Sequence, residues 1–284
     1  MDETAAPTAP TEDLETLKSQ ISCLESQLAA AKAQLQIQLP APQPPLHLWL
    51  LLADSALPIG SFAFSSGLES YISHRTLRHP LNPQKKPTPK TDLTRFLRLS
   101  LLSISTTTIP FITAAFQNPS TVLTLDDTFD ATTTCEVARR ASISQGRALC
   151  SVWDKSFASS LLNNTNSTTE DTFPTHHRPD HFGPSWGYIT RLTGLQNTPE
   201  SLYQVLFVFL FNHVKALLSA AVRLSLIGPY VAQQILASEE TRRLVDEAVE
   251  RGKKISVDEA GQSVPTIDLW QGRHERLYTR IFNS

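Results

Sequence analysis

The sequence predicts an all-α protein, with one multi-helix domain of about eight to ten helices after a disordered N-terminal arm and a short heptad helix. Apolar residues recur at steps of three and four along several segments, as amphipathic helices require. Alternating strand patterns are scarce, and there is no Asn-Gly or Asp-Gly hairpin signal. With 284 residues and 40% hydrophobic content, the chain can build one large core or two small ones.

Charge and cysteine content exclude several classes of protein. There are 25 basic and 27 acidic residues, so no strong field favours nucleic acid or an anionic membrane as partner. Cys23, Cys135 and Cys150 form no C-x-x-C pair, which argues against a disulfide framework and a zinc site. The N-terminal MDETAAPTAPTEDLE is acidic and has no apolar signal segment, so we expect a reduced, cytoplasmic protein.

The first 45 residues are predicted to form a region separate from the helical domain, which then spans 46–284. Residues 1–13 look disordered, and the segment PAPQPP at 40–45 should end a helix and act as a stiff linker. Between them, a heptad seam predicts either a coiled-coil helix for dimerisation or docking, or a solitary amphipathic helix. The seam consists of Leu14, Leu17, Ile21, Leu24, Leu28, Ala31 and Leu35.

The domain opens on an apolar run from Leu46 that is interrupted by Pro58-Ile59-Gly60. Proline lacks a backbone donor and glycine permits a turn, so the pattern predicts a helix–turn–helix corner. Phe62 and Phe64 follow among small residues, and we expect their rings to fill the corner as a packed plug. The composition favours a structural elbow over a functional site.

Two further helices are predicted before residue 160, and two polar inserts, 79–91 and 162–182, should be mobile surface loops. The first helix should end irregularly or kink at Thr106–Thr108 and Pro110. Its apolar stripe consists of Leu93, Phe96, Leu97, Leu101 and Ile104. The second is marked by Val137, Ala138, Ala141, Ala148, Leu149, Val152 and Trp153.

The clearest helical pattern follows Thr198-Pro199-Glu200, which supplies an N-cap, a pre-set φ and a favourable negative charge. Gly228-Pro229 is a stop signal, and another helix should run over 231–250. Charged and polar residues interrupt the apolar run, so we predict a buried core helix and no membrane span. The repeat consists of Phe207, Leu210, Phe211, Val214, Leu217, Leu218, Ala221 and Val222.

No catalytic or cofactor-binding residue is predicted. We expect no P-loop, no G-x-G-x-x-G segment and no G-x-S-x-G segment, so nucleotide binding and hydrolase chemistry both lack motif support. His176, His177 and His181 have the chemistry to bind nickel or zinc, but a solvated polar loop is favoured because ordering it costs entropy. His213 is predicted to be a hydrogen-bonded packing residue. Whether the chain holds a metal stays open.

Several segments together resemble the UreF family of urease accessory proteins. ALPIGSFAFSSGLESYI, at 56–72, resembles the family's Pro-x-Gly-small-aromatic turn and Gly-Leu-Glu helix. HFGPSWGYITRLTGL, the long helix containing Asn212, and the stretch around Gly146, which would let a second helix pack closely, resemble later elements. The C-terminal RHERLYTRIFNS resembles the family tail His-Glu-x-x-Tyr-x-Arg-hydrophobic-Phe-x-Ser. At Gly228 the chain departs from the family's Gly-Gln-x-x-Gly-Gln turn.

The resemblance implies a non-catalytic chaperone for nickel incorporation into apo-urease. It implies a homodimer that bridges a UreD/UreH-type scaffold and a UreG-type GTPase and influences GTP hydrolysis and nickel release. Nickel and GTP would be handled mainly by the rest of the complex, so no directly bound cofactor is expected. One alternative is a helical protein-interaction adaptor that acts through the N-terminal heptads and has no role in metal delivery. An enzyme with an unrecognised pocket is a third hypothesis, which no acid–base arrangement supports.

The resemblance also implies that the corner and the C-terminal tail form a partner-binding surface. Arg280 can make bidentate contacts that lysine cannot reproduce, and Glu69 would line a polar path or pair with a cation. A tail folded back on its own domain is the competing interpretation. The expected partner-binding residues are Phe62, Glu69, Tyr71, His274, Glu275, Tyr278, Arg280 and Phe282.

Overall fold

The computed structural model describes residues 18–28, 30–31, 46–78, 88–159 and 178–283. Contacts divide the chain into two compact units, Met1–Pro45 and Leu46–Ser284. In the first unit, residues 18–28 are helical, and Ile21, Leu24 and Leu28 are exposed along that helix. The heptad pattern thus lies on a helix, and its role in dimerisation or docking stays a prediction. The expected disordered arm at 1–13 and linker at 40–45 lie outside the described residues.

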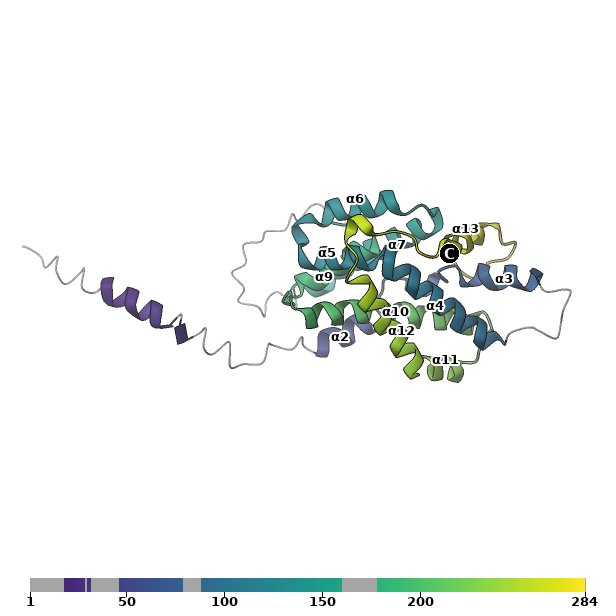
Figure 1. The fold of residues 1–284 in the computed structure, drawn as a ribbon, viewed down its shortest axis with the longest axis horizontal. Coiled ribbons are helices and arrows are strands. Elements are labelled where there is room, and N and C mark those ends of the chain that lie inside the picture. The colour runs from purple at the N-terminus through teal and green to yellow at the C-terminus, as the bar shows by residue number, and fades with distance from the viewer. Residues whose placement is uncertain (1–17, 29, 32–45, 79–87, 160–177, 284) are drawn as a thin grey trace, which may run out of the picture. The chain divides into compact units, whose positions relative to one another are not determined.

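The second unit is built from helices, and its described residues contain no strand, which confirms the all-α prediction (Figure 1). The α-helices are α2 (Leu46–Ala53), α3 (Leu68–Arg78), α4 (Pro89–Thr107), α5 (Ile109–Gln117), α6 (Val122–Thr132), α7 (Glu136–Val152), α9 (Phe182–Leu192), α10 (Pro199–Arg223), α11 (Pro229–Leu236), α12 (Glu239–Gly252) and α13 (Pro265–Arg273). The shorter turns are η1 (Ser61–Ala63), η3 (Pro119–Thr121), η4 (Trp153–Phe157), η5 (Val257–Glu259) and η6 (His274–Arg276).

Two sets of helices enclose the core, and members of both sets contact the long helix α10. Helix α9 packs against α5 and α7, and α12 packs against α4. The long helix α10 contacts α2, α11 and α12 and also touches α5. Its middle supplies fully buried side chains such as Leu206, Leu210 and Val214. Burial of these apolar surfaces is the main favourable contribution to the fold.

Helices α4 and α5 follow each other across a bend of 41°. The predicted stripe of α4 is buried at Leu93, Phe96, Leu97 and Leu101, and the predicted kink before Pro110 is confirmed. Proline can occupy the first turn of α5 without loss of a hydrogen bond, because the first amides of a helix have no intrahelical partner. The bend turns α5 towards α9.

The insert at 79–91 is not a loop throughout its length. Helix α4 begins at Pro89, and the Thr88 side chain accepts a hydrogen bond from the Thr91 amide at 3.2 Å. This is the same Thr-Pro start signal that was recognised at Thr198-Pro199, where the Thr198 side chain caps α10. The surrounding prolines and lysines obscured the signal in the sequence. Residues 79–87 lie outside the described part of the chain.

Helix α10 forms as predicted, but the helix expected over 231–250 is wrong in its extent. The chain instead forms α11 and α12, which are separated near Ser238. The Ser238 side chain accepts a hydrogen bond from the Thr241 amide at 3.2 Å and so starts a new helix. Among the described helices, α10 alone is long and apolar enough by itself to cross a membrane, and half of its most apolar window is buried. That burial agrees with the prediction of a core helix.

Gly146 brings the start of α9 against α7, as its position in the sequence indicated. A Cβ atom at residue 146 would lie 2.1 Å from the Asp180 carbonyl oxygen and 2.5 Å from the His181 carbonyl carbon. Any larger residue would therefore push the two backbones apart. This close contact holds residues 178–182 against α7.

Candidate functional site

The C-terminal tail lies against the first turn of α3, more than 200 residues earlier in the chain. The Glu69 carboxylate accepts a hydrogen bond from His274 Nε2 at 2.7 Å. It also accepts from the amides of Ile281 at 2.7 Å and Phe282 at 3.2 Å. Glu69, His274 and Phe282 are all buried. One carboxylate thus fixes both the beginning and the end of the tail.

The corner supplies the other side of this contact. The Asn283 amide donates to the Ala63 carbonyl at 2.9 Å, so the tail is paired with the backbone of η1. The Arg223 guanidinium lies 4.2 Å from the centre of the Phe282 ring and donates to the Phe62 carbonyl. A cation over a ring face is stabilising where water is excluded. The end of α10, the corner and the tail therefore form one assembly.

The structure separates the eight predicted partner-binding residues into a buried and an exposed group. The buried group is Glu69, Tyr71, His274 and Phe282. The exposed group is Phe62, Glu275, Tyr278 and Arg280, which we call the tail surface. Glu275 pairs with Arg140, which lowers the pKa of its carboxyl group. The tail is folded back on its own domain, as the competing interpretation held, while the tail surface is free to contact a partner. That role stays a prediction.

Phe62 corrects the predicted aromatic plug. Its side chain is 66% exposed, whereas Phe64 is half-buried and faces a cavity. Gly60 has φ +72° and starts the short η1 turn, which carries Phe62 outwards. The interior on this side is filled by a different aromatic cluster: Tyr71 lies 4.6 Å from Trp270 between ring centres.

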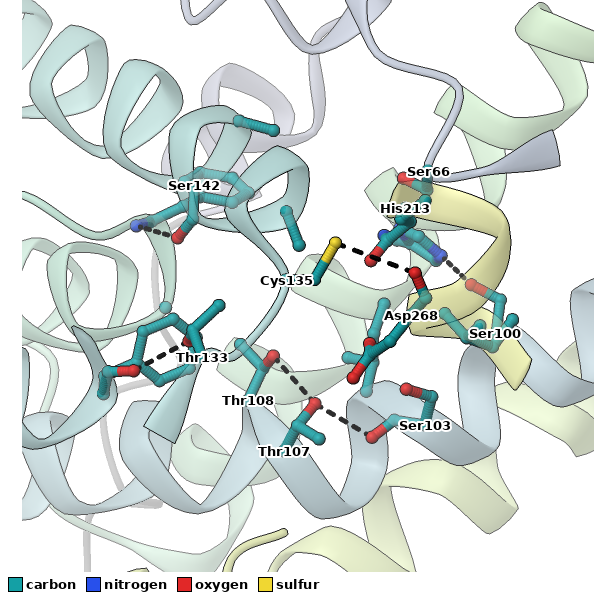
Figure 2. A pocket seen from close by; sticks show the side chains of 18 of the residues that line it. Ser66, Ser100, Ser103, Thr107, Thr108, Thr133, Cys135, Ser142, His213 and Asp268 are labelled. Atoms are coloured by element: carbon teal, nitrogen blue, oxygen red, sulfur yellow. Dashed lines mark hydrogen bonds between the residues drawn. The ribbon is translucent and has the colours of Figure 1, made fainter. Parts of the chain in front are cut away.

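A cavity of about 370 Å³ lies behind the corner, among α4, α7, α10 and α13 (Figure 2). Its wall combines aromatic rings with many hydroxyl groups, among them Ser100, Ser103 and Thr107. No lysine or arginine is among the described residues that line it. Gln262 accepts from Ser103 and donates to Asp268, each at 2.8 Å, and burial raises the pKa of Asp268. Without a cation in its wall, the cavity is unsuited to a phosphate group such as that of GTP.

His213 lies in the cavity wall, with its Nε2 atom 2.8 Å from Ser100 Oγ, which agrees with the predicted packing role. Burial lowers the pKa of His213 from its ordinary 6.5 to about 4.

The half-buried His213 should make stability depend on pH, because desolvation of its ring lowers its pKa in the folded chain. The unfolded chain takes up a proton near pH 6.5 and the folded chain only near pH 4, so stability falls as pH drops through that window. We expect a loss of about 2 kcal/mol between pH 7 and pH 5 from this residue. Urea unfolding of the wild type and His213→Gln at both pH values measures it, because the variant lacks this contribution. Equal losses in both proteins would contradict the prediction.

His181 corrects another prediction, because it is buried and ordered where a solvated loop was expected. Its Nε2 atom lies 2.8 Å from Asp130 Oδ1, and its Nδ1 atom lies 3.2 Å from Ser142 Oγ. Its amide donates to Asp126 Oδ1 at 2.9 Å. The bidentate contact with Arg139 is the main cause that lowers the pKa of Asp130. The Phe182 amide at the start of α9 also donates to Ser142 Oγ at 3.1 Å, so the network satisfies an orphan amide of the helix and has a structural role.

The sequence left open whether His176, His177 and His181 together bind a metal ion. The first two lie outside the described residues, and His181 is occupied by its two partners. Across the described part of the chain, no group of three or more histidine, cysteine, aspartate or glutamate residues is placed to hold a metal ion. The described residues therefore offer no nickel site of the usual kind.

One sequence pattern was missed. Gly183-Pro184-Ser185-Trp186-Gly187 matches the G-x-S-x-G arrangement of hydrolase nucleophiles. That chemistry needs an exposed serine on a sharp turn between a strand and a helix. Ser185 is instead fully buried in the first turn of α9, and its hydroxyl donates to the Pro179 carbonyl at 3.1 Å. The arrangement closes a helix start and offers no nucleophile.

Comparison with known proteins identifies the family. A family model described as UreF matches residues 88–239. The chain belongs to the UreF family. It is 35% identical to an "Uncharacterized urease accessory protein UreF-like" of Schizosaccharomyces pombe, over 84% of this chain and 97% of that protein. It is 32% identical to "Urease accessory protein F" of rice, Oryza sativa subsp. indica, over 82% of this chain and 83% of that protein.

A bacterial relative extends the range of the similarity. The chain is 30% identical to "Urease accessory protein UreF" of Paenarthrobacter aurescens, over 82% of this chain and 95% of that protein. The UreF match at 88–239 covers α4 to α11 and the first residue of α12 but not the corner at 58–72 or the tail at 274–283. The match to the family model therefore gives no support to the tail surface, and the case for that surface depends on geometry.

Proposed function

We propose that this protein is a cytoplasmic, non-catalytic urease accessory protein that supports nickel incorporation into apo-urease. As a homodimer, it would bridge a UreD/UreH-type scaffold and a UreG-type GTPase and modulate GTP hydrolysis and nickel release. UreF family membership and relatives named as urease accessory proteins support the role in urease maturation. The proposal of a bridging role is supported by the tail surface, which is a set of exposed side chains on a firmly held backbone.

The composition of the tail surface suits protein recognition. Aromatic residues and arginine dominate the energetics of many interfaces, and Tyr278, Phe62 and Arg280 present both kinds of side chain. Their exposure leaves the apolar area of Phe62 and Tyr278 in water, which a partner would remove. A nucleotide or nickel bound to the GTPase would then be controlled through contact of the GTPase with the tail surface.

A gene-deletion experiment tests the maturation role. Cells without this gene should produce urease polypeptide with little activity, and excess nickel should restore part of that activity. The full chain should restore activity at ordinary nickel, and the amount of urease polypeptide should be measured alongside. Full urease activity in the deletion strain at ordinary nickel would contradict the proposal.

The adaptor hypothesis keeps one observation in its favour, the exposed heptad residues Ile21, Leu24 and Leu28. Deleting residues 1–45 separates the two functions. A chain of residues 46–284 should still restore urease activity if the helical domain does the work. An adaptor that acts through the heptads should lose its partner and all its effect.

A further inference from the structure

We infer that the N-terminal helix, residues 18–28, pairs antiparallel with the same helix of a second copy of this chain. The contact goes beyond the proposed function, because that function belongs to the helical domain and this helix lies in the separate unit Met1–Pro45. The UreF match at 88–239 does not reach that unit, so the family assignment gives the helix no role. Its residues alone carry the inference.

The apolar face of the N-terminal helix needs a partner. Ile21, Leu24 and Leu28 follow the three-and-four step of a heptad seam, and they are 53%, 63% and 56% exposed. A lone helix of this length is marginal in water, because so few hydrogen bonds hardly offset the cost of ordering the chain. The sequence keeps the same step from Leu14 to Leu35, so pairing with another helix would bury a seam of about three heptads.

The charges beside the seam make the helix complementary to itself. With Ile21 and Leu28 at a positions and Leu24 at a d position, Lys18 and Glu25 both fall at e positions, and both are exposed. In an antiparallel pair, e positions face each other across the seam, so Lys18 lies opposite Glu25 of the second copy. The twofold axis of such a pair repeats every contact, so the opposite-charge contact occurs twice.

The same charges select one register. In this register Ile21 packs beside Leu24 of the second copy at the centre of the pair, where both side chains lose exposed apolar area. A shift by one heptad in one direction places Glu25 opposite Glu25, and a shift in the other direction places Lys18 opposite Lys18. Like charges in these positions are unfavourable, so both shifted registers are disfavoured.

A parallel pair suits these residues less well. In a parallel pair, g positions face e positions, so Lys18 would meet Asp13 but Glu25 would meet the neutral Gln20. The two copies of Ala31 would also share one layer of the seam and leave it underfilled. The antiparallel pair gives both described charges an opposite partner, and we therefore infer that arrangement.

The contact should hold two chains together at concentrations where the helical domains alone separate. A second binding site on the same chain raises the effective concentration of the first. We expect the full chain to self-associate about tenfold or more tightly than residues 46–284, which contain all of the buried core. Sedimentation equilibrium of the two purified proteins over a range of concentrations measures this difference.

Charge reversal tests the antiparallel register in the full chain. Lys18→Glu and Glu25→Lys each place like charges opposite each other twice, so each variant alone should self-associate about fivefold or more weakly than the wild type. An equimolar mixture of the two variants should recover the wild-type affinity, because an acidic helix then faces a basic one in both contacts. In a parallel pair, Glu25→Lys would meet only Gln20 and would change nothing.

Two further variants separate the seam from the outer face of the helix. Leu24→Gln keeps a good helix former but removes the central apolar contact, so association should fall to that of residues 46–284. Ser22→Gln places the same residue at an outer b position and should leave association unchanged. Thermal unfolding of the helical domain should be the same in all of these variants, because the residues lie in the other unit.

Three results would overturn the inference. These are equal self-association of the full chain and residues 46–284, wild-type association of Glu25→Lys, and a mixture of the charge variants that stays as weak as either alone. The urease test of residues 46–284 is independent of all three. Restored urease activity with no N-terminal contact would leave the proposed function standing alone, and the contact would stand if that urease test failed.

Discussion

Replacing Tyr278 and Arg280 by alanine should abolish capture of the UreD/UreH-type scaffold and the UreG-type GTPase while the domain stays folded. Both side chains are exposed, so their removal costs the core no apolar contact, and Tm should change little. Truncation of an interface hot spot costs about 2 kcal/mol or more, and tyrosine and arginine are enriched among hot spots. The effect is measured by pull-down with purified partners, beside a thermal unfolding curve.

The chain offers matched controls for these two variants. Tyr230 on α11 is 85% exposed, and Arg251 at the end of α12 is exposed as well. Tyr230→Ala with Arg251→Ala removes the same kinds of side chain from outside the tail. Arg280→Lys should restore binding only in part, because lysine cannot form the planar bidentate contact. Undiminished recovery of both partners by the tail variant would refute the assignment.

Point variants are better suited to this question than truncation. Loss of the last several residues also removes Phe282, which is buried beneath Arg223, and leaves Glu69 without two of its donors. A shortened chain therefore changes the interior as well as the surface. Residues 278 and 280 change the surface alone.

The helices were predictable because local patterns determine them. The three-and-four spacing on α4 matches its buried stripe, and the Thr198 cap matches the start of α10. On α10 the predicted repeat matches the buried face only in part, because Phe207, Phe211 and Val222 are half-buried. The same rules would have located the starts of α4 at Thr88-Pro89 and of α12 at Ser238. An insert rich in proline surrounds the first of these signals, and an unbroken apolar period runs across the second.

The site was less predictable because its contacts are long-range. Glu69 meets residues 274, 281 and 282 across more than 200 positions, and no local spacing encodes that pairing. The resemblance brought the right segments together but not their division into buried and exposed groups. The wrong prediction of a solvated His181 has the same cause. Its partners Asp130 and Ser142 lie on α6 and α7, so the polar residues next to it in the sequence do not show that its side chain is buried.

Trp186→Ala should have the largest effect on stability. The indole is fully buried in α9, its Nε1–H donates to the Val205 carbonyl at 3.1 Å, and its ring lies 5.8 Å from that of Phe209 between centres. Truncation of a buried tryptophan costs about 3–5 kcal/mol, through lost burial and the cavity left behind. Since whole domains are stable by only about 5–15 kcal/mol, most of the margin would disappear.

The effect of Trp186→Ala is measured by urea unfolding followed by circular dichroism. Trp186→Phe is the matched control, because it keeps an aromatic ring in the contact with Phe182 and Phe209 and loses mainly the hydrogen bond. It should cost clearly less than the alanine variant. Helix α9 lies between α5 and α7 and also contacts α10, so a loss at Trp186 should loosen all four helices in one transition. Equal stability of the alanine and phenylalanine variants would mean that the space around residue 186 collapses without cost, which the rigid contact at Gly146 argues against.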